Sequence, residues 1–436
     1  MADYKSHLRV LNKESLVLKE RQIEILDLLR KGKKEIIGIL PTGYGKSLIY
    51  EIAPLMLSGT VIVISPLTSI QVEQFQRLTE TPLKTCILNV KVTGRIITGL
   101  DIEDEMVDME SSTPIEEIYH TNLIFAHPEA IFNTVEGRKL LDCDRFKSGV
   151  KAIVIDECHK VHEWGKSFRT AFKHIQDMAA FLPDAARLGL SATVSLQEEK
   201  DIVKALGMKT PCIVKESPDR TNIYLEKNLK GSANDVFEMF ENIYKPLCDN
   251  LFVKKENFPV TLVYIPIQYM GSAMSYCRFI FRNSNLHNCL YGALCSGQDE
   301  KVKATILTDL GKKVPRIRLI FCTSVIGMGF NSPSIDCVIH TKPPRNLSDF
   351  VQEIGRAGRD GRPARSILYY CKRDISNNVP DIKNDIVQYC NVDTCLRSCM
   401  LSQFGFEKGD MIDHECCMYC KESCKCIECE ILRIEL

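Results

Sequence analysis

A glycine-rich stretch that follows an apolar run is the first place where residue types and spacing suggest chemistry. The run EIIGIL (35–40) predicts a buried strand, and it leads through PTGYGKS (41–47) into a segment with helical character. In such a unit, backbone N–H groups beside glycines approach phosphate oxygens, the lysine adds a positive charge, and the serine hydroxyl can bind Mg²⁺. The unit therefore predicts a nucleoside triphosphate site. Its residues are Pro41, Thr42, Gly43, Tyr44, Gly45, Lys46 and Ser47.

A pair of acidic residues supplies the second half of such a site. Asp156 and Glu157 follow the apolar run KAIVI, which predicts another buried strand. Asp156 is placed to hold Mg²⁺ through water, and Glu157 is placed to polarise a water that attacks the terminal phosphate. Adjacent carboxylates are also common at ordinary strand ends. Together with the phosphate loop farther up the chain, however, they indicate hydrolysis of a nucleoside triphosphate.

Two series of short apolar runs set out the elements that must position these residues. Each run is followed by a stretch that can form a helix, a pattern typical of parallel sheets covered by helices. The first series comprises residues 35–40, 60–65, 122–127 and 151–156, and the second comprises residues 260–265, 318–323, 336–340 and 366–371. The acidic segment 102–112 is predicted to be a solvated loop or helix face. Two open α/β sheets are therefore expected.

Length and composition agree with a globular protein of two or three domains. The chain has 436 residues, of which 45% are hydrophobic and 26% charged, and this mix excludes a disordered or fibrous protein. The formal net charge is zero, so it gives no sign of a nucleic-acid partner. The N-terminus lacks an apolar signal region, and no run approaches the roughly 18 apolar residues of a membrane span. An intracellular protein without a membrane partner is predicted.

Two changes in character divide the chain. Pro218 and its polar neighbours interrupt regular structure, and beyond Arg373 the apolar runs give way to cysteines. Nine of the 20 cysteines fall within residues 390–429, and in a reducing compartment such crowding indicates a metal site before disulfides. The expected domains are residues 1–217, 218–372 and 373–436.

Three further strings narrow the class of protein. Residues 156–159, DECH, resemble the D-E-x-H box of superfamily two helicases. HKVHEWGKSFR (159–169) looks like the aromatic-rich loop of the RecQ family of ATP-dependent DNA helicases, and QEIGRAGRDGR (352–362) is the most specific matching string. The resemblance covers about residues 16–372 and extends into the tail. It implies an α/β fold with two tandem RecA-like domains, their parallel sheets flanked by helices, and a small helical zinc-binding subdomain.

The resemblance also implies roles for single residues. Lys19 and Gln22 would recognise adenine, and an arginine pair from the second domain would stabilise charge on the γ-phosphate. The catalytic set would be Lys46, Asp156, Glu157, Gln352, Arg356 and Arg359. The residues expected to contact single-stranded DNA are Pro66, Trp164, Phe168, Arg169 and Thr323. The residues expected to couple the nucleotide and DNA sites are His159, Ser191 and Thr193.

The cysteine-rich tail resembles the RecQ zinc segment, in which thiolates bind Zn²⁺ tetrahedrally. The matching ligands would be Cys395, Cys417, Cys420 and Cys424. Cys399, Cys416 and Cys426 remain alternatives for the fourth position, and a reduced tail without metal is the other interpretation. Four thiolates leave no open position, so the metal would stabilise the fold rather than take part in a reaction.

As a whole, the resemblance implies an ATP-dependent 3′–5′ DNA helicase that uses Mg²⁺ and acts in DNA repair or recombination. Its expected partners are single-stranded and partly duplex DNA. The expected state is a monomer in the nucleus. Three alternatives remain: a DNA-stimulated translocase that does not unwind, a nucleic-acid-binding regulator with a degenerate ATPase, and an RNA helicase. Strand displacement would separate the first of these from a helicase.

Overall fold

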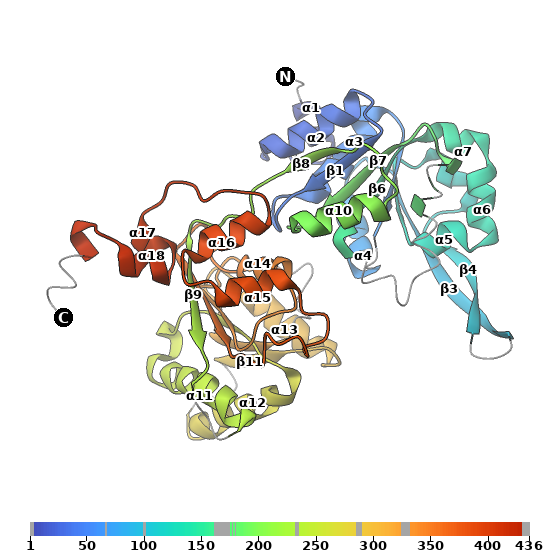
Figure 1. Ribbon diagram of the computed structural model, residues 1–436. Coiled ribbons are helices and arrows are strands. Elements are labelled where there is room, and N and C mark those ends of the chain that lie inside the picture. The colour runs from blue at the N-terminus through green and yellow to red at the C-terminus, as the bar shows by residue number, and fades with distance from the viewer. Residues whose placement is uncertain are drawn as a thin grey trace. The chain divides into compact units, whose positions relative to one another are not determined.

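The chain divides into two compact units, Met1–Ser217 and Pro218–Leu436, each built around its own sheet (Figure 1). The computed structural model describes residues 4–65, 68–98, 102–160, 175–176, 178, 180–231, 235–284, 290–323 and 332–429. Among the helices in these ranges, none is both long enough and apolar enough to cross a bilayer.

The first unit contains an eight-stranded sheet in the order β4-β3-β5-β2-β6-β7-β1-β8. All neighbouring strands are parallel except β3 and β4. The strands are β1 (Glu35–Ile39), β2 (Thr60–Ile64), β3 (Thr85–Thr98), β4 (Ile102–Ser111), β5 (Leu123–Ala126), β6 (Val150–Ile155), β7 (Ala186–Ser191) and β8 (Cys212–Lys215).

Helices cover this sheet because both of its faces are apolar. Alternate residues of one strand enter different clusters: Ile37 packs in one hydrophobic cluster and Ile36 in another. Such continuous apolar strands need helices on both faces. The α-helices are α1 (Lys5–Val10), α2 (Glu20–Arg30), α3 (Lys46–Leu57), α4 (Thr68–Leu78), α5 (Pro128–Phe132), α6 (Val135–Asp142), α7 (Asp144–Gly149) and α10 (Leu196–Ala205), and the short 3₁₀ helices are η1 (Ile115–His120) and η2 (Cys158–Lys160).

The acidic segment 102–112 is not the loop or helix face that its composition predicts. Residues 102–111 form β4, which pairs antiparallel with β3 from Thr98↔Ile102 to Leu88↔Ser111. The pair extends from the edge of the sheet (Figure 1). Acidic residues are poor strand formers in general. Here the neighbouring β3 supplies the backbone partners that make the segment a strand.

The second unit contains a six-stranded, fully parallel sheet in the order β11-β12-β10-β13-β14-β9. The strands are β9 (Ile223–Leu229), β10 (Thr261–Tyr264), β11 (Tyr291–Leu294), β12 (Leu319–Cys322), β13 (Cys337–His340) and β14 (Ala364–Tyr370). The helices are α11 (Val236–Lys254), η3 (Lys255–Asn257), α12 (Ile267–Phe281), α13 (Glu300–Leu310), α14 (Leu347–Ile354), α15 (Asn384–Asn391), α16 (Leu396–Gln403), α17 (Asp413–Cys416) and α18 (Met418–Ser423). Two parallel α/β sheets were expected from the apolar runs, and the structure confirms them.

The cysteine-rich tail packs onto the second sheet. One hydrophobic cluster joins Leu225 of β9 to Leu396, Met400 and Cys417 of the tail. An isolated parallel bridge also links Leu225 to Cys417. Helices α17 and α18 accordingly lie beside β9 (Figure 1). The tail therefore shares the core of the second unit.

Candidate nucleotide site

The predicted phosphate loop connects β1 to α3 and exposes its backbone. Gly43 has φ +80° and Gly45 has φ +90°, a conformation that L side chains rarely adopt. A Cβ atom on Gly45 would lie 2.7 Å from Nε2 of Gln22, so a larger residue would displace that side chain. Gly45 caps α3, and Lys46 and Ser47 open the helix. The positive end of a helix therefore faces the place expected for phosphate.

Gln22 fixes this loop from α2. Its Nε2 donates to the carbonyl oxygens of Tyr44 (3.0 Å) and Gly45 (2.9 Å), and its Oε1 accepts from the backbone N–H of Lys19 (2.8 Å). The ammonium of Lys19 lies 4.4 Å from the centre of the Tyr44 ring, a cation–π contact. The Tyr44 hydroxyl donates to Glu216 at 3.0 Å. Thus Lys19 and Gln22 both lie against the phosphate loop, and Gln22 holds it in shape.

The acidic pair follows β6, where both side chains are turned into the unit. Asp156 is 7% exposed, and its Oδ1 accepts the backbone N–H of Glu157 at 3.0 Å. Burial and the charge of Glu157 raise the pKa of Asp156 to about 7. Burial also opposes ionisation of Glu157, but the positive charges of Lys46 and His159 outweigh it and lower the pKa of that carboxyl. Lys46 therefore stabilises negative charge on both carboxylates.

His159 and Ser191 complete a polar cluster at the same edge of the sheet. Nδ1 of His159 lies 3.2 Å from the Ser191 hydroxyl and 3.4 Å from Oε2 of Glu157. Ser191 ends β7, which lies between β6 and β1, and Thr193 follows it as a buried residue. The strand order therefore brings the expected coupling residues between the phosphate loop and the carboxylates.

The donor set suits Mg²⁺, which prefers oxygen ligands and keeps several waters. Ser47 presents a hydroxyl from the first turn of α3, and Asp156 presents a carboxylate at the end of β6. Among the described residues, Oε2 of Glu157 has no hydrogen-bond partner although it is buried. Its contact there is the ion pair with His159 at 3.4 Å, and a buried carboxylate oxygen that makes no hydrogen bond is a place where water or a cation would be stabilised.

The arginine residues of the second unit lie just beyond α14. Arg356 is 2% exposed and hydrogen-bonds the hydroxyl of Tyr264. Burial and the nearby Arg356 charge lower the pKa of Arg359 to about 10, so this guanidinium is still protonated at neutral pH. Gln352 lies on α14 and is half-buried. The structure thus brings Gln352, Arg356 and Arg359 together in one segment.

Two residues that the sequence did not single out hold this segment. Arg220 donates to the carbonyls of Gly355 (3.1 Å), Ala357 (3.2 Å) and Gly358 (2.6 Å). The Asn222 amide donates to Gly358 (2.8 Å) and Arg362 (2.7 Å). The stretch SPDRTN had been interpreted only as a break between domains. The signal available in the sequence was that this short linker contains an arginine and an asparagine, whose side chains can donate several hydrogen bonds to backbone carbonyls.

Thr323, expected to contact DNA, follows β12 and lines a cavity of about 280 Å³ in the second unit. Lys342 and Arg345 also line this cavity, together with the acidic residues Asp349 and Glu353. Thr323 Oγ1 is buried and has no hydrogen-bond partner among the described residues. Pro66, Trp164, Phe168 and Arg169 lie outside the described residues.

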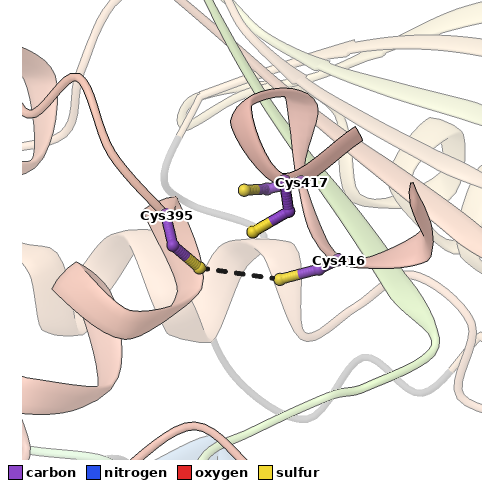
Figure 2. A group of neighbouring side chains, drawn as sticks. Cys395, Cys416 and Cys417 are labelled. Carbon is purple, nitrogen blue, oxygen red and sulfur yellow. Dashed lines mark hydrogen bonds between the residues drawn. The ribbon is translucent and has the colours of Figure 1, made fainter. Parts of the chain in front are cut away.

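The cysteine tail contains two separate groups of metal-binding side chains. In the first, the ligand atoms of Cys395, Cys416, Cys417 and Cys420 all lie within 4.8 Å of one another. Figure 2 shows Cys395, Cys416 and Cys417 pointing toward one another, with Sγ atoms of the first two 3.7 Å apart. Thiolates bound to one tetrahedral Zn²⁺ lie about 3.8 Å apart, given bonds of about 2.3 Å. The first group therefore fits a structural zinc ion.

The membership of this group differs from the sequence prediction at one position. Cys395, Cys417 and Cys420 lie together as expected, but the fourth thiol is that of Cys416, whereas Cys424 belongs to the second group. Cys416 ends α17, and the chain turns there so that two adjacent cysteines face Cys395. The resemblance places the last ligand at Ser423, separated from Cys420 by two residues, and Cys424 is the nearest thiol to that position. The turn between α17 and α18 instead brings the adjacent Cys416 and Cys417 into one group.

The family comparisons agree with the order of these sites along the chain. A family model for DEAD/DEAH box helicases matches residues 19–202, and a model for the helicase conserved C-terminal domain matches residues 243–361. The first contains the phosphate loop and the acidic pair, and the second contains the arginine segment.

Curated relatives match most of this chain at low identity. "ATP-dependent helicase SGS1" of Saccharomyces cerevisiae is 28% identical over 93% of this chain and 27% of its own length. "Putative ATP-dependent RNA helicase R290" of Acanthamoeba polyphaga mimivirus is 27% identical over 91% of this chain and 69% of its own length. "ATP-dependent DNA helicase RecQ" of Bacillus subtilis is 26% identical over 89% of this chain and 62% of its own length. The chain thus spans little more than a quarter of SGS1 and under two thirds of RecQ.

Solved structures share the fold at lower identity. The helicase MrfA bound to DNA superposes with a TM-score of 0.60 at 16% identity, covering 85% of this chain and 51% of MrfA. The DEAD-box helicase Mss116 bound to single-stranded RNA gives a TM-score of 0.59 at 12% identity, covering 100% and 83%. These likenesses confirm two tandem RecA-like domains. Both helicase domain models match in order along the chain, and over most of its length the chain is similar to ATP-dependent helicases that include RecQ, at 26–28% identity.

Proposed function

We propose that this protein is an ATP-dependent DNA helicase that moves 3′ to 5′ along one strand and unwinds duplex DNA in repair or recombination. The observation that carries the proposal is the phosphate loop of β1 and α3 beside a buried acidic pair that ends β6. The RecQ relative supports DNA as the partner. ATP and Mg²⁺ would be the cofactors of the first unit, with Ser47 and Asp156 holding the metal.

The chemistry of ATP hydrolysis follows from the side chains of the first unit. Lys46 would neutralise charge on the β- and γ-phosphates, while the glycine N–H groups hold their oxygens. Glu157 would orient the attacking water and accept its proton, since its buried Oε2 makes no hydrogen bond within the described part of the chain and lies 3.4 Å from the imidazole of His159. Bound Mg²⁺ would offset the charge that develops on the phosphates.

Coupling to DNA would depend on groups in both units. Gln352, Arg356 and Arg359 would act on the γ-phosphate, because a guanidinium stabilises the negative charge of the transition state. Trp164, Phe168 and Arg169, together with Pro66 and Thr323, would contact single-stranded DNA by stacking and by phosphate contacts. The nucleotide site and the DNA contacts would be coupled by His159, Ser191 and Thr193, so that binding or hydrolysis of ATP changes how DNA is held.

The test is steady-state ATP hydrolysis with and without single-stranded DNA, for wild type and Trp164→Ala. We expect strong stimulation by DNA that Trp164→Ala loses, while hydrolysis without DNA stays unchanged. Phe181→Ala is the matched control, since Phe181 is an exposed aromatic residue of the same unit, 41% accessible. If the wild-type protein hydrolyses ATP at the same rate with and without single-stranded DNA, the proposed coupling is refuted.

A second candidate, an RNA helicase, is favoured by one observation, the mimivirus relative that is named as a putative RNA helicase. Single-stranded RNA of the same length and sequence, tested in the same hydrolysis assay, separates the two. If RNA stimulates ATP hydrolysis more strongly than DNA does, the partner is RNA and not DNA. Displacement of a labelled strand from partly duplex DNA then distinguishes a helicase from a translocase that does not unwind.

A further inference from the structure

The second group of metal-binding side chains lies at the end of the described tail and is separate from the first. Its members are His414, Cys424, Cys426 and Cys429, whose ligand atoms all lie within 4.8 Å of one another. Nδ1 of His414 lies 3.2 Å from Sγ of Cys426 and 3.7 Å from Sγ of Cys424. Ligands around one tetrahedral Zn²⁺ are separated by about 3.5–3.8 Å, given Zn–N and Zn–S bonds of about 2.0–2.3 Å. One ion therefore fits among these four atoms.

The burial of these cysteines has no explanation in apolar packing. Cys424 is 3% exposed and Cys429 is 7% exposed. Within the described part of the chain, neither residue belongs to any of the four hydrophobic clusters, whereas Cys416, Cys417 and Cys420 are members of one. A shared metal ion explains why such a small, polar segment folds back on itself.

The imidazole of His414 is oriented as in many metal sites. Its Nδ1 faces the thiols, and its Nε2 lies 3.7 Å from a carboxylate oxygen of Glu428. This distance is longer than a hydrogen bond, but the carboxylate lies on the side of the ring where, in many metal sites, one accepts the N–H of a ligating histidine. Three thiolates and one imidazole are a donor set typical of structural Zn²⁺.

The two groups alternate along the chain. Helix α17 carries His414 of the second group and Cys416 of the first, and α18 carries Cys420 of the first group, with Cys424 of the second group directly after it. Each metal site therefore needs α17 in the same position. We propose that His414, Cys424, Cys426 and Cys429 bind a second structural Zn²⁺ ion, which fastens residues 424–429 to α17 beside the first zinc site.

Metal content of the full-length chain tests this proposal without any measurement of activity. The protein is purified in reducing buffer with zinc present and dialysed, and bound zinc is measured by mass spectrometry. We expect two zinc ions per chain for wild type and one for Cys426→Ser. Cys399→Ser is the matched control and should keep two, because Cys399 lies in the same tail but in neither group. One ion in wild type, unchanged in Cys426→Ser, overturns the proposal.

A second measurement keeps the proposal testable if Cys426→Ser does not fold. Apo-protein reconstituted with Co²⁺ should show two sets of visible bands, from one site with four thiolates and one with three thiolates and an imidazole. His414→Cys should retain two ions and shift only the second set toward the first. A wild-type spectrum that His414→Cys leaves unchanged, or a disulfide among Cys424, Cys426 and Cys429 in the purified protein, would rule the second site out.

Discussion

Asp156 and Glu157 are adjacent carboxylates with different surroundings, and that difference separates their roles. Oδ1 of Asp156 is already engaged by the N–H of its neighbour, whereas Oε2 of Glu157 is buried without a hydrogen-bond partner among the described residues. Glu157 also has φ +50°, a conformation that costs a non-glycine residue about 1 kcal/mol or more. Such strain at a buried carboxylate is typical of a residue that is positioned for a reaction.

The first prediction concerns this residue. Glu157→Gln keeps the shape of the side chain but removes its ability to accept a proton, so ATP hydrolysis should fall by roughly 10²–10⁴-fold. ATP binding should persist, because Lys46 and the glycine N–H groups are unchanged. Steady-state hydrolysis and equilibrium binding of a fluorescent nucleotide measure the two effects separately.

Glu110→Gln is the control for this substitution, since Glu110 is an exposed carboxylate on β4, at the opposite side of the same sheet from β1. It should leave both quantities unchanged. A Glu157→Gln protein that hydrolyses ATP at the wild-type rate would show that another group activates the water.

At the scale of elements, residues 355–362 follow α14 and are not helical themselves. Hydrogen bonds from distant side chains to their backbone carbonyls hold their conformation. Gly358 has φ +56°, and a Cβ there would lie 2.4 Å from the Asn222 amide and 2.8 Å from the Arg362 carbonyl. Arg220 donates to three carbonyl oxygens within residues 355–358 of the same segment. The conformation that carries Arg356 and Arg359 therefore depends on a residue far away in the sequence.

The second prediction tests this dependence. Arg220→Ala removes the donors to Gly355, Ala357 and Gly358, so the Arg356 and Arg359 guanidinium groups should lose their fixed positions. Misplacement of about 1 Å can cost on the order of 10²-fold in rate. We expect kcat for ATP hydrolysis to fall by about that factor while nucleotide affinity is retained, since the phosphate loop belongs to the other unit.

Arg365→Ala is the matched control, because Arg365 lies on β14 in the same unit and pairs with Glu226 at an exposed site. It should hydrolyse ATP normally. Loss of nucleotide affinity in Arg220→Ala, with kcat unchanged, would mean that Arg220 does not position the arginine segment.

The sequence predicts an element well when the residues of that element alone determine its structure, and poorly when contacts with other segments determine it. The apolar runs at 35–40 and 151–156 became β1 and β6 within a residue or two, because strands buried on both faces carry their own signal. The acidic composition of residues 102–112 predicts a loop or helix face, whereas β4 forms by pairing with β3, a contact between segments that composition does not record. The exchange of Cys424 for Cys416 has the same origin, since it depends on a turn that the spacing of cysteines does not record.

At the scale of the whole chain, the tail and the arginine segment are joined through one buried side chain. Arg397 of α16 is 1% exposed, forms an ion pair with Asp219, and donates to the carbonyls of Arg220 (3.1 Å) and Cys416 (3.4 Å). Arg397 therefore contacts the first cysteine group on one side and the residue that holds the arginine segment on the other. The tail is part of the structure that supports the second unit.

The third prediction concerns the free energy of unfolding of this unit. Arg397→Ala removes the ion-pair partner of Asp219 and the donor to the carbonyls of Arg220 and Cys416, and removing one partner of a buried ion pair costs about 3–5 kcal/mol. Lys408→Ala is the control, because Lys408 pairs with an exposed carboxylate of Asp413, a class of contact worth about 0–1 kcal/mol. Urea unfolding, with proteolysis of the second unit as the readout, should show a clear loss of unfolding free energy for Arg397→Ala. It should show almost no loss for Lys408→Ala. Equal, small losses in both variants would mean that the tail is held by its metal sites and apolar contacts, and that Arg397 adds little to the link with β9.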